Sequence, residues 1–337
     1  MTDQRRRRSM TARIAIVGAG LAGATAARLL TRAGAKVTVF EKSGGTGGRL
    51  STRRTDYGSF DHGAQYVSAR GDAFLDTVYR LVAEGGAMNW SPAGKDREDE
   101  WHVGHPGMSG FVKPLLGGID VRTNSRVSAI QAGDDAIRVQ LEDGREQDFE
   151  VALVTAPAPQ SLALLKDIDG AFAKIAKAQM APCWSVMLAF GKRIDRLPDI
   201  RRGNDGDVLG WIARDSSKPG REGLENIVVH AGTDWSRDHL EETPEAVLDA
   251  VLTALRGAAG GEALSPVHAV AHRWRYARVD RPVGEPFLAG CRGRVIACGD
   301  WCIGARAEAA FDSGRLAAEF LVRERLAGEA EAAYMRG

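Results

Sequence analysis

The chain has 337 residues, which at roughly 150 residues per domain suggests about two domains. Its 45 lysines and arginines nearly balance its 44 aspartates and glutamates, and the net charge of +1 argues against a nucleic-acid binder with a broad basic face. The longest run without a charged residue, 151–165, is shorter than the about 20 apolar residues of a membrane-spanning helix. Composition therefore favours a globular protein that binds neither nucleic acid nor membrane, and we expect it in the cytoplasm.

The N-terminal part of the chain carries four consecutive arginines at 5–8. No apolar segment with a cleavage site follows them, so they do not resemble a secretory signal. We expect residues 1–10 to form a disordered tail, and Met10 is a second candidate for the start of the chain. The cysteines are not spaced as in a metal or redox motif, so we predict no metal site and a reducing compartment. These cysteines are Cys183, Cys291, Cys298 and Cys302.

The first recognisable unit consists of a strand, a helix and a second strand. A short β-branched run predicts a strand at 13–17, an alanine- and leucine-rich segment predicts a helix at 24–33, and another apolar run predicts a strand at 36–40. Glu41 follows the second strand, where its carboxylate can accept hydrogen bonds from ribose hydroxyls. This spacing predicts a dinucleotide-binding βαβ unit.

Three glycines lie between the first strand and the helix. Gly18 permits a tight turn, Gly20 lets the backbone approach a phosphate, and Gly23 lets the helix pack closely on the strand. The N–H groups that open the helix, next to Leu21 and Ala22, would bind the pyrophosphate of a dinucleotide. This unit alone leaves open whether the dinucleotide carries a nicotinamide or a flavin.

A second glycine cluster, at 44–49, distinguishes between a nicotinamide and a flavin cofactor. It contains Gly48 and Arg49 and resembles the second fingerprint of the glutathione-reductase-like flavoproteins, in their amine oxidase branch. The glycines allow close backbone approach, and Arg49 would add a cation to the pyrophosphate. Lys42, just before the cluster, is also expected to bind the cofactor. The cluster therefore favours FAD.

The C-terminal part of the chain completes the predicted cofactor site. A buried strand is expected at 294–298, and Gly299 and Asp300 follow it directly. In flavoproteins of this type, an acidic residue at such a position binds the ribityl chain, so the resemblance assigns this role to Asp300. The predicted cofactor is FAD, bound non-covalently.

The same resemblance implies further cofactor contacts. A helix is expected at 308–327, and its first N–H groups, at Ala309 and Ala310, would face the pyrimidine end of the flavin. There the helix dipole would stabilise negative charge on the reduced ring. Val127 would read the adenine through its backbone, and Gln65 would contact the flavin.

The predicted fold is α/β. It comprises a Rossmann-like FAD-binding domain of the glutathione-reductase and amine-oxidase type, with an inserted mixed α+β substrate domain built on an antiparallel sheet. The FAD-binding domain is expected to be discontinuous, because its elements stand at both ends of the chain. Its predicted segments are 11–80, 115–160 and 290–328, and those of the substrate domain are 81–114 and 161–289.

Several longer segments resemble the renalases, in particular those of bacteria. They are spread over residues 13–325 and lie at 48–54, 61–66, 103–109, 156–160, 271–278 and 298–302. One departure stands at Ala309-Ala310, where the family more often has Gly-Ala. The resemblance implies an oxidase that takes hydride from 2- or 6-dihydro isomers of NAD(P)H, releases NAD(P)+ and passes the electrons to O2, forming hydrogen peroxide.

Such a reaction places few demands on catalytic side chains. Hydride donation by a dihydropyridine is driven by recovery of aromaticity, so no strong general base is required and no catalytic residue is assigned. A flat, partly apolar slot above the flavin is needed instead, and the strand expected at 267–276 would offer alternate side chains to it. Each residue predicted to bind substrate is also compatible with ordinary core or loop packing. These residues are Tyr66, Arg70, Trp184, Trp274 and Tyr276.

Two other functions stay open. Amine oxidases of this branch usually carry a lysine close to the flavin, and no lysine of the inserted domain has a motif of that kind around it. A flavin-binding redox sensor without enzymatic activity is the second alternative. The expected partners are a dihydropyridine nucleotide and O2, and no protein partner is implied. The lysines in question are Lys166, Lys174, Lys177, Lys192 and Lys218.

Overall fold

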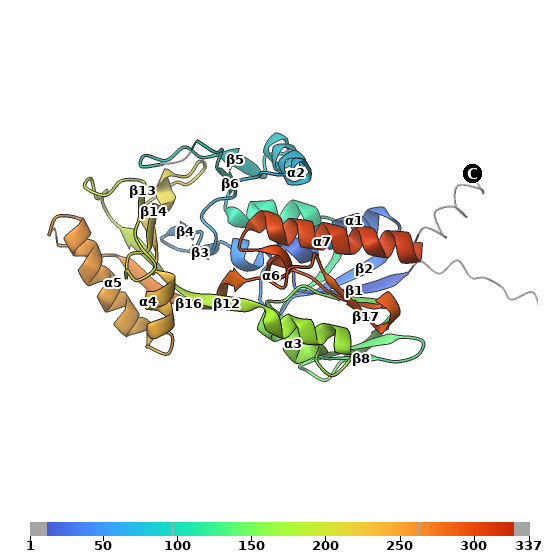
Figure 1. Cartoon of the computed structure of the whole chain (residues 1–337). Coiled ribbons are helices and arrows are strands. Elements are labelled where there is room, and N and C mark those ends of the chain that lie inside the picture. The colour runs from blue at the N-terminus through green and yellow to red at the C-terminus, as the bar shows by residue number, and fades with distance from the viewer. Residues whose placement is uncertain (1–11, 96–97, 262, 327–337) are drawn as a thin grey trace, which may run out of the picture.

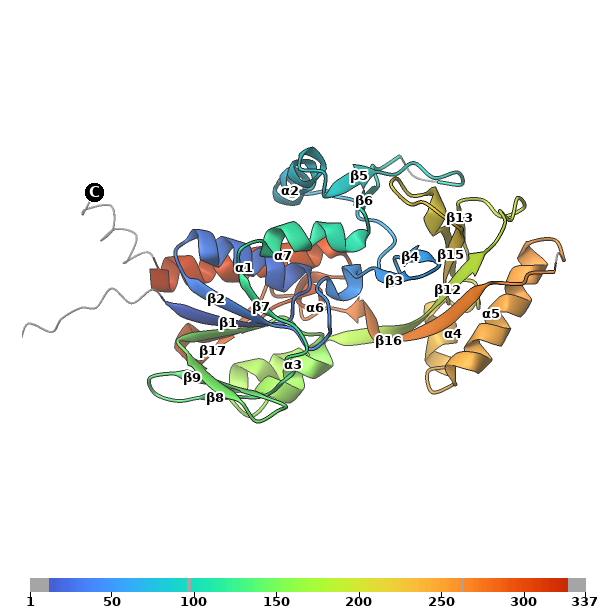
Figure 2. The same ribbon diagram turned by 180° about the vertical axis from the view of Figure 1, so that it is seen from behind.

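The computed structural model describes residues 12–95, 98–261 and 263–326, so the predicted tail at 1–10 lies outside the described residues. Two main sheets organise the molecule. Two long strands, β12 (Gln179–Phe190) and β16 (His268–Arg281), extend from one body of the molecule into the other (Figure 1; Figure 2). Among the described residues, no helix has the length and apolar character needed to cross a bilayer.

The first sheet has six strands and is mostly parallel. Its order is β17-β18-β11-β1-β2-β7, and β17 is the antiparallel edge strand. Nearly every residue of the inner strands is buried, as expected for a parallel sheet that is covered on both faces. The strands are β1 (Arg13–Val17), β2 (Lys36–Phe40), β7 (Asp120–Arg122), β11 (Val151–Val154), β17 (Leu288–Gly290) and β18 (Val295–Ala297).

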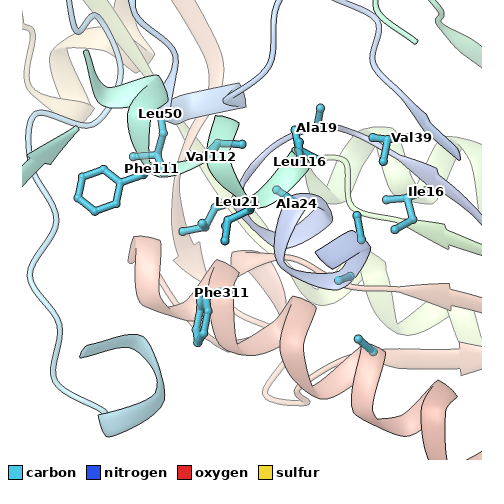
Figure 3. Packing of buried hydrophobic residues seen from close by; sticks show 14 of the residues in the cluster. Ile16, Ala19, Leu21, Ala24, Val39, Leu50, Phe111, Val112, Leu116 and Phe311 are labelled. Atoms are coloured by element: carbon cyan, nitrogen blue, oxygen red, sulfur yellow. The ribbon is translucent and has the colours of Figure 1, made fainter. Parts of the chain in front are cut away.

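Two helices from opposite ends of the chain cover one face of this sheet, α1 (Leu21–Arg32) and α7 (Ala307–Leu321) (Figure 1). They approach closely at Gly314, where an added Cβ would clash with the backbone of Ala22. Leu21 and Phe311 belong to the same buried cluster (Figure 3). The parallel sheet is therefore covered by packing between the first and the last α-helix of the described chain.

A second layer packs against the other face of the parallel sheet. Its apolar core includes Val17, Phe149 and Phe172. The layer contains α3 (Ala158–Leu165), a 3-10 helix (Gly170–Lys177) and a three-stranded sheet of β8 (Val127–Ala132), β9 (Ile137–Leu141) and β10 (Glu146–Phe149). Between β2 and β7 the chain also forms β3 (Arg53–Thr55), β4 (Gly58–Phe60), α2 (Asp72–Ala83), β5 (Ala87–Asn89) and β6 (His102–Gly104).

The second large sheet is antiparallel, with the order β13-β14-β15-β12-β16. Alternation along β12 gives its two faces different partners. Val186 and Leu188 pack with the helix-covered core, whereas Met187 and Ala189 meet Phe60 of β4. The new elements are β13 (Ile200–Arg202), β14 (Trp211–Arg214), β15 (Glu225–His230), α4 (Thr233–Asp238) and α5 (Pro244–Ala258).

These two sheets confirm the predicted fold class. A Rossmann-like parallel sheet is assembled from both ends of the chain, and an antiparallel sheet is inserted between them. The domain boundaries drawn from the sequence stay a prediction. Two element bounds differ from expectation: the first helix begins at Leu21 rather than at 24, and the strand predicted at 267–276 continues to Arg281. The helix starts early because Gly20 is its N-cap, directly after the glycine turn.

We predict that Gly314→Ala destabilises the protein by about 1–3 kcal/mol, because the new methyl group forces α1 and α7 apart. Gly257→Ala is the matched control, since Gly257 also lies in a helix but its Cβ would meet nothing within 4 Å. This control should be stabilising by up to about 1 kcal/mol. Urea unfolding of both variants measures the difference, and equal effects would contradict the close packing of the two helices.

Candidate active site

The glycine turn after β1 is tight on one side and open on the other. Gly18 has φ 107°, and its N–H donates to the Phe40 carbonyl at 2.8 Å. A Cβ on Gly23 would clash with the carbonyl oxygen of Gly18, whereas one on Gly20 would meet nothing within 4 Å. Helix α1 has Gly20 as its N-cap, without a side-chain cap or an acidic residue in its first turn. The turn therefore fits an anionic group at the helix N-terminus.

The second glycine cluster lies directly against this turn. The N–H of Gly47 donates to the Ala19 carbonyl at 2.9 Å. Gly48 has φ 56°, and its Cβ position is 3.3 Å from the Cα of Gly20. The two glycine segments that the sequence singles out thus form one surface, with Leu21 and Ala22 buried behind it at the start of α1.

Glu41 is held rigidly at the end of β2. Its carboxylate accepts hydrogen bonds from the N–H of Ala19 at 2.9 Å and from the N–H of Ser43 at 2.8 Å. Lys42, beside it, donates to the side chain of Gln160 at 3.1 Å, and burial lowers the pKa of its ammonium group. This carboxylate is therefore fixed between the two glycine segments, as a ribose-binding residue would be.

A hollow of about 400 Å³ opens beside Lys42, the residue that follows Glu41. Lys42, Ser125 and Arg126 contribute to its lining, and Val127 begins β8 directly after them. Val127 is buried and follows Arg126, which lines the hollow. These positions are compatible with the predicted adenine contact, which stays a prediction.

Arg49 and Asp300 form a bidentate pair. Both guanidinium-to-carboxylate distances are 2.6 Å, and Arg49 also donates to the Ala277 carbonyl of β16 at 3.1 Å. Asp300 opens α6 (Asp300–Ile303) after Gly299, which has φ 153°. The sequence assigned these two side chains to different parts of the cofactor. The structure brings them together, so each fixes the position of the other.

The first turn of α7 carries the two alanines expected to face the flavin. Ala309 is buried and Ala310 is half-buried. The carboxylate of Glu308, in the same turn, accepts from the backbone N–H of Arg70 at 3.0 Å and from that of Gly71 at 2.5 Å. The backbone of Arg70 is thus tied to α7, while its side chain is exposed. A role for this side chain in substrate binding stays a prediction.

Four strands of the antiparallel sheet place a row of polar and aromatic side chains side by side. Strand pairing aligns Trp211 with His230, His230 with Ser185, and Ser185 with His272. Paired residues of neighbouring strands project from the same face. This face is the one that meets Phe60 of β4. We call these four residues the cross-strand row.

His62, which follows β4, lies over this row. Its ring stacks on Trp274 with centroids 5.1 Å apart and meets His272 edge-on at 5.0 Å. The indole N–H of Trp274 donates to the His62 carbonyl at 2.9 Å. Trp274, predicted to bind substrate, therefore lies beside a histidine cluster that the sequence did not identify. The residues His62, His230 and His272 are far apart in sequence, and no short motif joins them.

The three histidines are held neutral. Burial lowers the pKa of His62 to about 3 and that of His230 to about 4, and burial also lowers the pKa of His272. The positive charge of Arg53 further lowers the pKa of His62 and that of His272. The positive charge of Lys218 further lowers the pKa of His230. The face therefore combines neutral imidazoles and indoles with a positive electrostatic environment.

Gln65 is oriented by a buried ionic cluster. Lys218 donates to the side-chain oxygen of Gln65 at 3.1 Å and pairs with Asp61 at 3.1 Å and Asp215 at 2.5 Å. Arg221 pairs with Asp61 at 2.6 Å. Although burial raises the pKa of Asp61, Lys218 and Arg221 lower it to about 2. We call Asp61, Asp215, Lys218 and Arg221 the ionic cluster.

The ionic cluster is the main feature that sequence reasoning missed. Lys218 is fully buried, although no motif around it marks it as different from the other lysines of the inserted segment. Its amine is shared between Asp61 and Asp215, and its partner Asp61 is 157 residues away. Only the segment 61–66, which resembles the renalases and begins at Asp61, offered a signal.

The other residues predicted to bind substrate have different positions. Tyr66 stacks on Trp101 with ring centroids 3.8 Å apart, and its hydroxyl accepts from Arg202 at 3.4 Å. Tyr276 is half-buried on β16, next to the carbonyl that Arg49 contacts. Both residues therefore lie near the candidate site, and their contact with substrate stays a prediction.

Trp184 requires a correction. It is 1% exposed, packs in the core under α5, and donates its indole N–H to the His239 carbonyl at 2.9 Å. It precedes Ser185 in β12, so alternation directs it to the opposite face from the cross-strand row. The prediction that Trp184 binds substrate was wrong, because sequence alone did not reveal which face of β12 is covered by helices.

Comparison with known families agrees with this architecture. A family model described as flavin containing amine oxidoreductase matches residues 84–321, and one described as an NAD(P)-binding Rossmann-like domain matches residues 16–83. Renalase from Mus musculus is 24% identical over 298 residues, which cover 81% of this chain and 87% of that protein. The predicted resemblance to the renalases is confirmed.

Solved structures share the fold. Cyclohexylamine oxidase from Brevibacterium oxydans has a TM-score of 0.74 at 13% identity, covering 94% of this chain and 99% of that one. A putrescine oxidase bound to putrescine has a TM-score of 0.69 at 14% identity, covering 94% of this chain and 100% of that one. At these identities the likeness establishes a common fold.

We predict that Lys218→Met destabilises the protein by about 3–5 kcal/mol, because it leaves buried carboxylates without their shared cation. Lys174→Met is the matched control: Lys174 pairs with Glu285 at 2.8 Å but is half exposed, so its loss should cost less than about 1 kcal/mol. Chemical unfolding at pH 7 compares the variants. Similar values for both would contradict the structural role of the ionic cluster.

The neutral histidines also predict a pH dependence of stability. Their ordinary pKa is 6.5, so between about pH 6.5 and 4 the unfolded chain binds protons that folded His62 and His230 do not. The free energy of unfolding should therefore fall as the pH falls through this window, by about 1.4 kcal/mol per pH unit for each such proton. Unfolding of wild type and of a His62→Gln/His230→Gln double variant from pH 7 to 4 tests this. An unchanged slope in the variant would refute the assignment.

Proposed function

The chain belongs to the family of flavin-containing amine oxidoreductases, and from this premise we propose that it is an FAD-dependent oxidase of 2- or 6-dihydro isomers of NAD(P)H. The products would be NAD(P)+ and, from O2, hydrogen peroxide. When bound, FAD supplies the redox chemistry, accepting a hydride and returning the two electrons to O2. The similarity to renalase supports this choice within the family.

The observation that carries the proposal is the charge of the face around the cross-strand row. Its imidazoles are neutral, and Arg53, the charged side chain that acts on His62 and His272, is a cation. A protonated amine would be repelled there, whereas a neutral dihydropyridine with anionic phosphates would not. A dihydropyridine also needs no base to release hydride, and the neighbouring carboxylates of the ionic cluster are already paired.

The residues that would hold FAD follow from the same geometry. The open turn at Gly20 and the uncapped start of α1 suit the pyrophosphate, and the fixed carboxylate of Glu41 suits a ribose. The Arg49–Asp300 pair would contact the chain between pyrophosphate and ring. Burial raises the pKa of Cys298 to about 12 and that of Cys302 well above its ordinary value. Thiolate attack on the flavin is thereby disfavoured, which supports non-covalent binding.

Rapid mixing under anaerobic conditions tests the function. The purified holoenzyme is mixed with the 2- and 6-dihydro isomers, with ordinary NADH, and with a panel of primary amines, and bleaching of the oxidised flavin is followed. Fast bleaching by an isomer, with hydrogen peroxide on readmission of air, is the expected result. Bleaching by an amine alone would make the protein an amine oxidase. Bleaching by no donor would favour a flavin-binding redox sensor.

We predict that Arg49→Ala weakens FAD binding by roughly 10–100-fold, because Asp300 is left as an uncompensated anion beside the pyrophosphate site. The flavin-to-protein ratio after dialysis, followed by titration of the apoprotein with FAD, measures the change. Arg138→Ala removes a pair with Asp148 that is exposed, and it should bind FAD like the wild type. Full flavin occupancy in the Arg49 variant at low FAD would argue against this contact.

A further inference from the structure

Arg53 of β3 is a cation without a carboxylate partner, in a region where several other arginines are paired. Its side chain is exposed, and among the described residues its guanidinium forms neither an ion pair nor a hydrogen bond. Arg53 therefore leaves an uncompensated positive charge within reach of an anionic ligand. The paired arginines of the region are Arg49 with Asp300, Arg221 with Asp61, and both Arg273 and Arg275 with Glu241.

Strand pairing determines the direction in which the Arg53 side chain projects. Arg53 is the direct partner of Phe60 in the antiparallel pair of β3 and β4, and such partners project from the same face. Phe60 is fully buried and packs with Met187 of β12 and Val228 of β15. Arg53 therefore lies on the side of the hairpin that meets the antiparallel sheet, next to which the hairpin is seen in both views (Figure 1; Figure 2).

On this side of the hairpin, Arg53 lies near the flat aromatic part of the candidate site. His62, two residues after Phe60, stacks on Trp274 and meets His272 edge-on. The positive charge of Arg53 lowers the pKa of both histidines, which agrees with a guanidinium close to both rings. The neutral rings do not compensate this charge. Because His272 and Trp274 are only half-buried, this part of the face is accessible to a ligand.

An arginine at this place suits a phosphate group. The planar guanidinium offers several N–H donors in a fork that matches phosphate oxygens, and hydrogen bonds between charged groups are stronger than those between neutral groups. A ring beside Trp274 that carries a ribose 5′-phosphate would present its anionic group to Arg53. A primary amine gains nothing from this charge, because it brings no anion to the guanidinium.

We propose that Arg53 binds the phosphate nearest to the ring of a nicotinamide nucleotide and so selects nucleotides over their phosphate-free ribosides. This inference rests on the proposed function, because it takes the ring beside Trp274 to be a dihydropyridine. It goes further in naming the side chain that recognises the phosphate. This phosphate is common to NADH, NADPH and the mononucleotide, so Arg53 selects the class of nucleotide rather than one member of it.

Arg54 is the matched control for this contact. It is exposed, forms no ion pair among the described residues, and carries the same charge one residue further along β3. Its cross-strand partner is Ser59, so alternation directs it to the opposite side of the hairpin from Arg53. Glutamine at either position removes one exposed charge, and both variants should fold like the wild type. A difference between them therefore reports a contact rather than a change in net charge.

Calorimetric titration of the oxidised holoenzyme measures the contact. The ligands are nicotinamide mononucleotide and nicotinamide riboside, which differ by one phosphate. The wild type should bind the mononucleotide about tenfold or more tightly than the riboside. Arg53→Gln should abolish most of this preference, whereas Arg54→Gln should keep it. A wild type that binds both ligands equally, or an equal loss of preference in the two variants, would overturn the proposal.

Reduction of the flavin separates this inference from the proposed function. If a dihydro isomer reduces the wild-type flavin but Arg53→Gln keeps the preference for the mononucleotide, the function stands and the phosphate contact is wrong. If no isomer reduces the flavin but the preference is lost in Arg53→Gln alone, Arg53 binds a nucleotide phosphate and the proposed function is overturned.

Discussion

The arrangement of the candidate site depends on one buried group of charges, the ionic cluster. Lys218 and Arg221 come from the segment after β14, whereas Asp61 follows β4. Charges removed from water are tolerated only when each is paired, so these segments have one favourable arrangement. Arg221 also donates to the carbonyl of Gly104, and Lys218 fixes Gln65. The position of His62, the next residue after Asp61, follows from the same constraint.

Pairing of this kind also sets the chemical character of the site. The ionic cluster contains two cations and two carboxylates, and the Arg49–Asp300 pair is balanced as well. Neutral histidines lie close to these compensated groups. Near the ionic cluster a ligand is therefore selected by shape and by hydrogen bonds, and Arg53 supplies the positive charge that disfavours a protonated amine.

The cofactor side of the molecule was predictable because its signals are local. The glycines between β1 and α1 and the acid at the end of β2 lie within one short unit, and each has a backbone requirement that few residues meet. The fold class followed from finding such units at both ends of the chain. The contact between Arg49 and Asp300 was not predicted, since it joins residues 251 positions apart.

The substrate side was less predictable because it depends on strand register. The sequence gives the alternation of β16 but not the residues of β12 and β15 that lie beside it, and a shift of one residue exchanges the two faces. Trp184 was placed on the wrong face of β12 for this reason. Burial of Lys218 likewise arises from partners brought together by the tertiary fold.

The packing of α7 on α1 has a consequence for how the protein is made. The glycine turn is synthesised first, but the parallel sheet behind the turn also needs β18. The helix α7, which covers this sheet together with α1, ends only at Leu321. The antiparallel sheet between them is complete at Arg281, before either arrives. All strands of the inserted sheet have therefore been synthesised while the nucleotide-binding half is still unfinished. Cofactor capture becomes a late event, after nearly the whole chain has emerged.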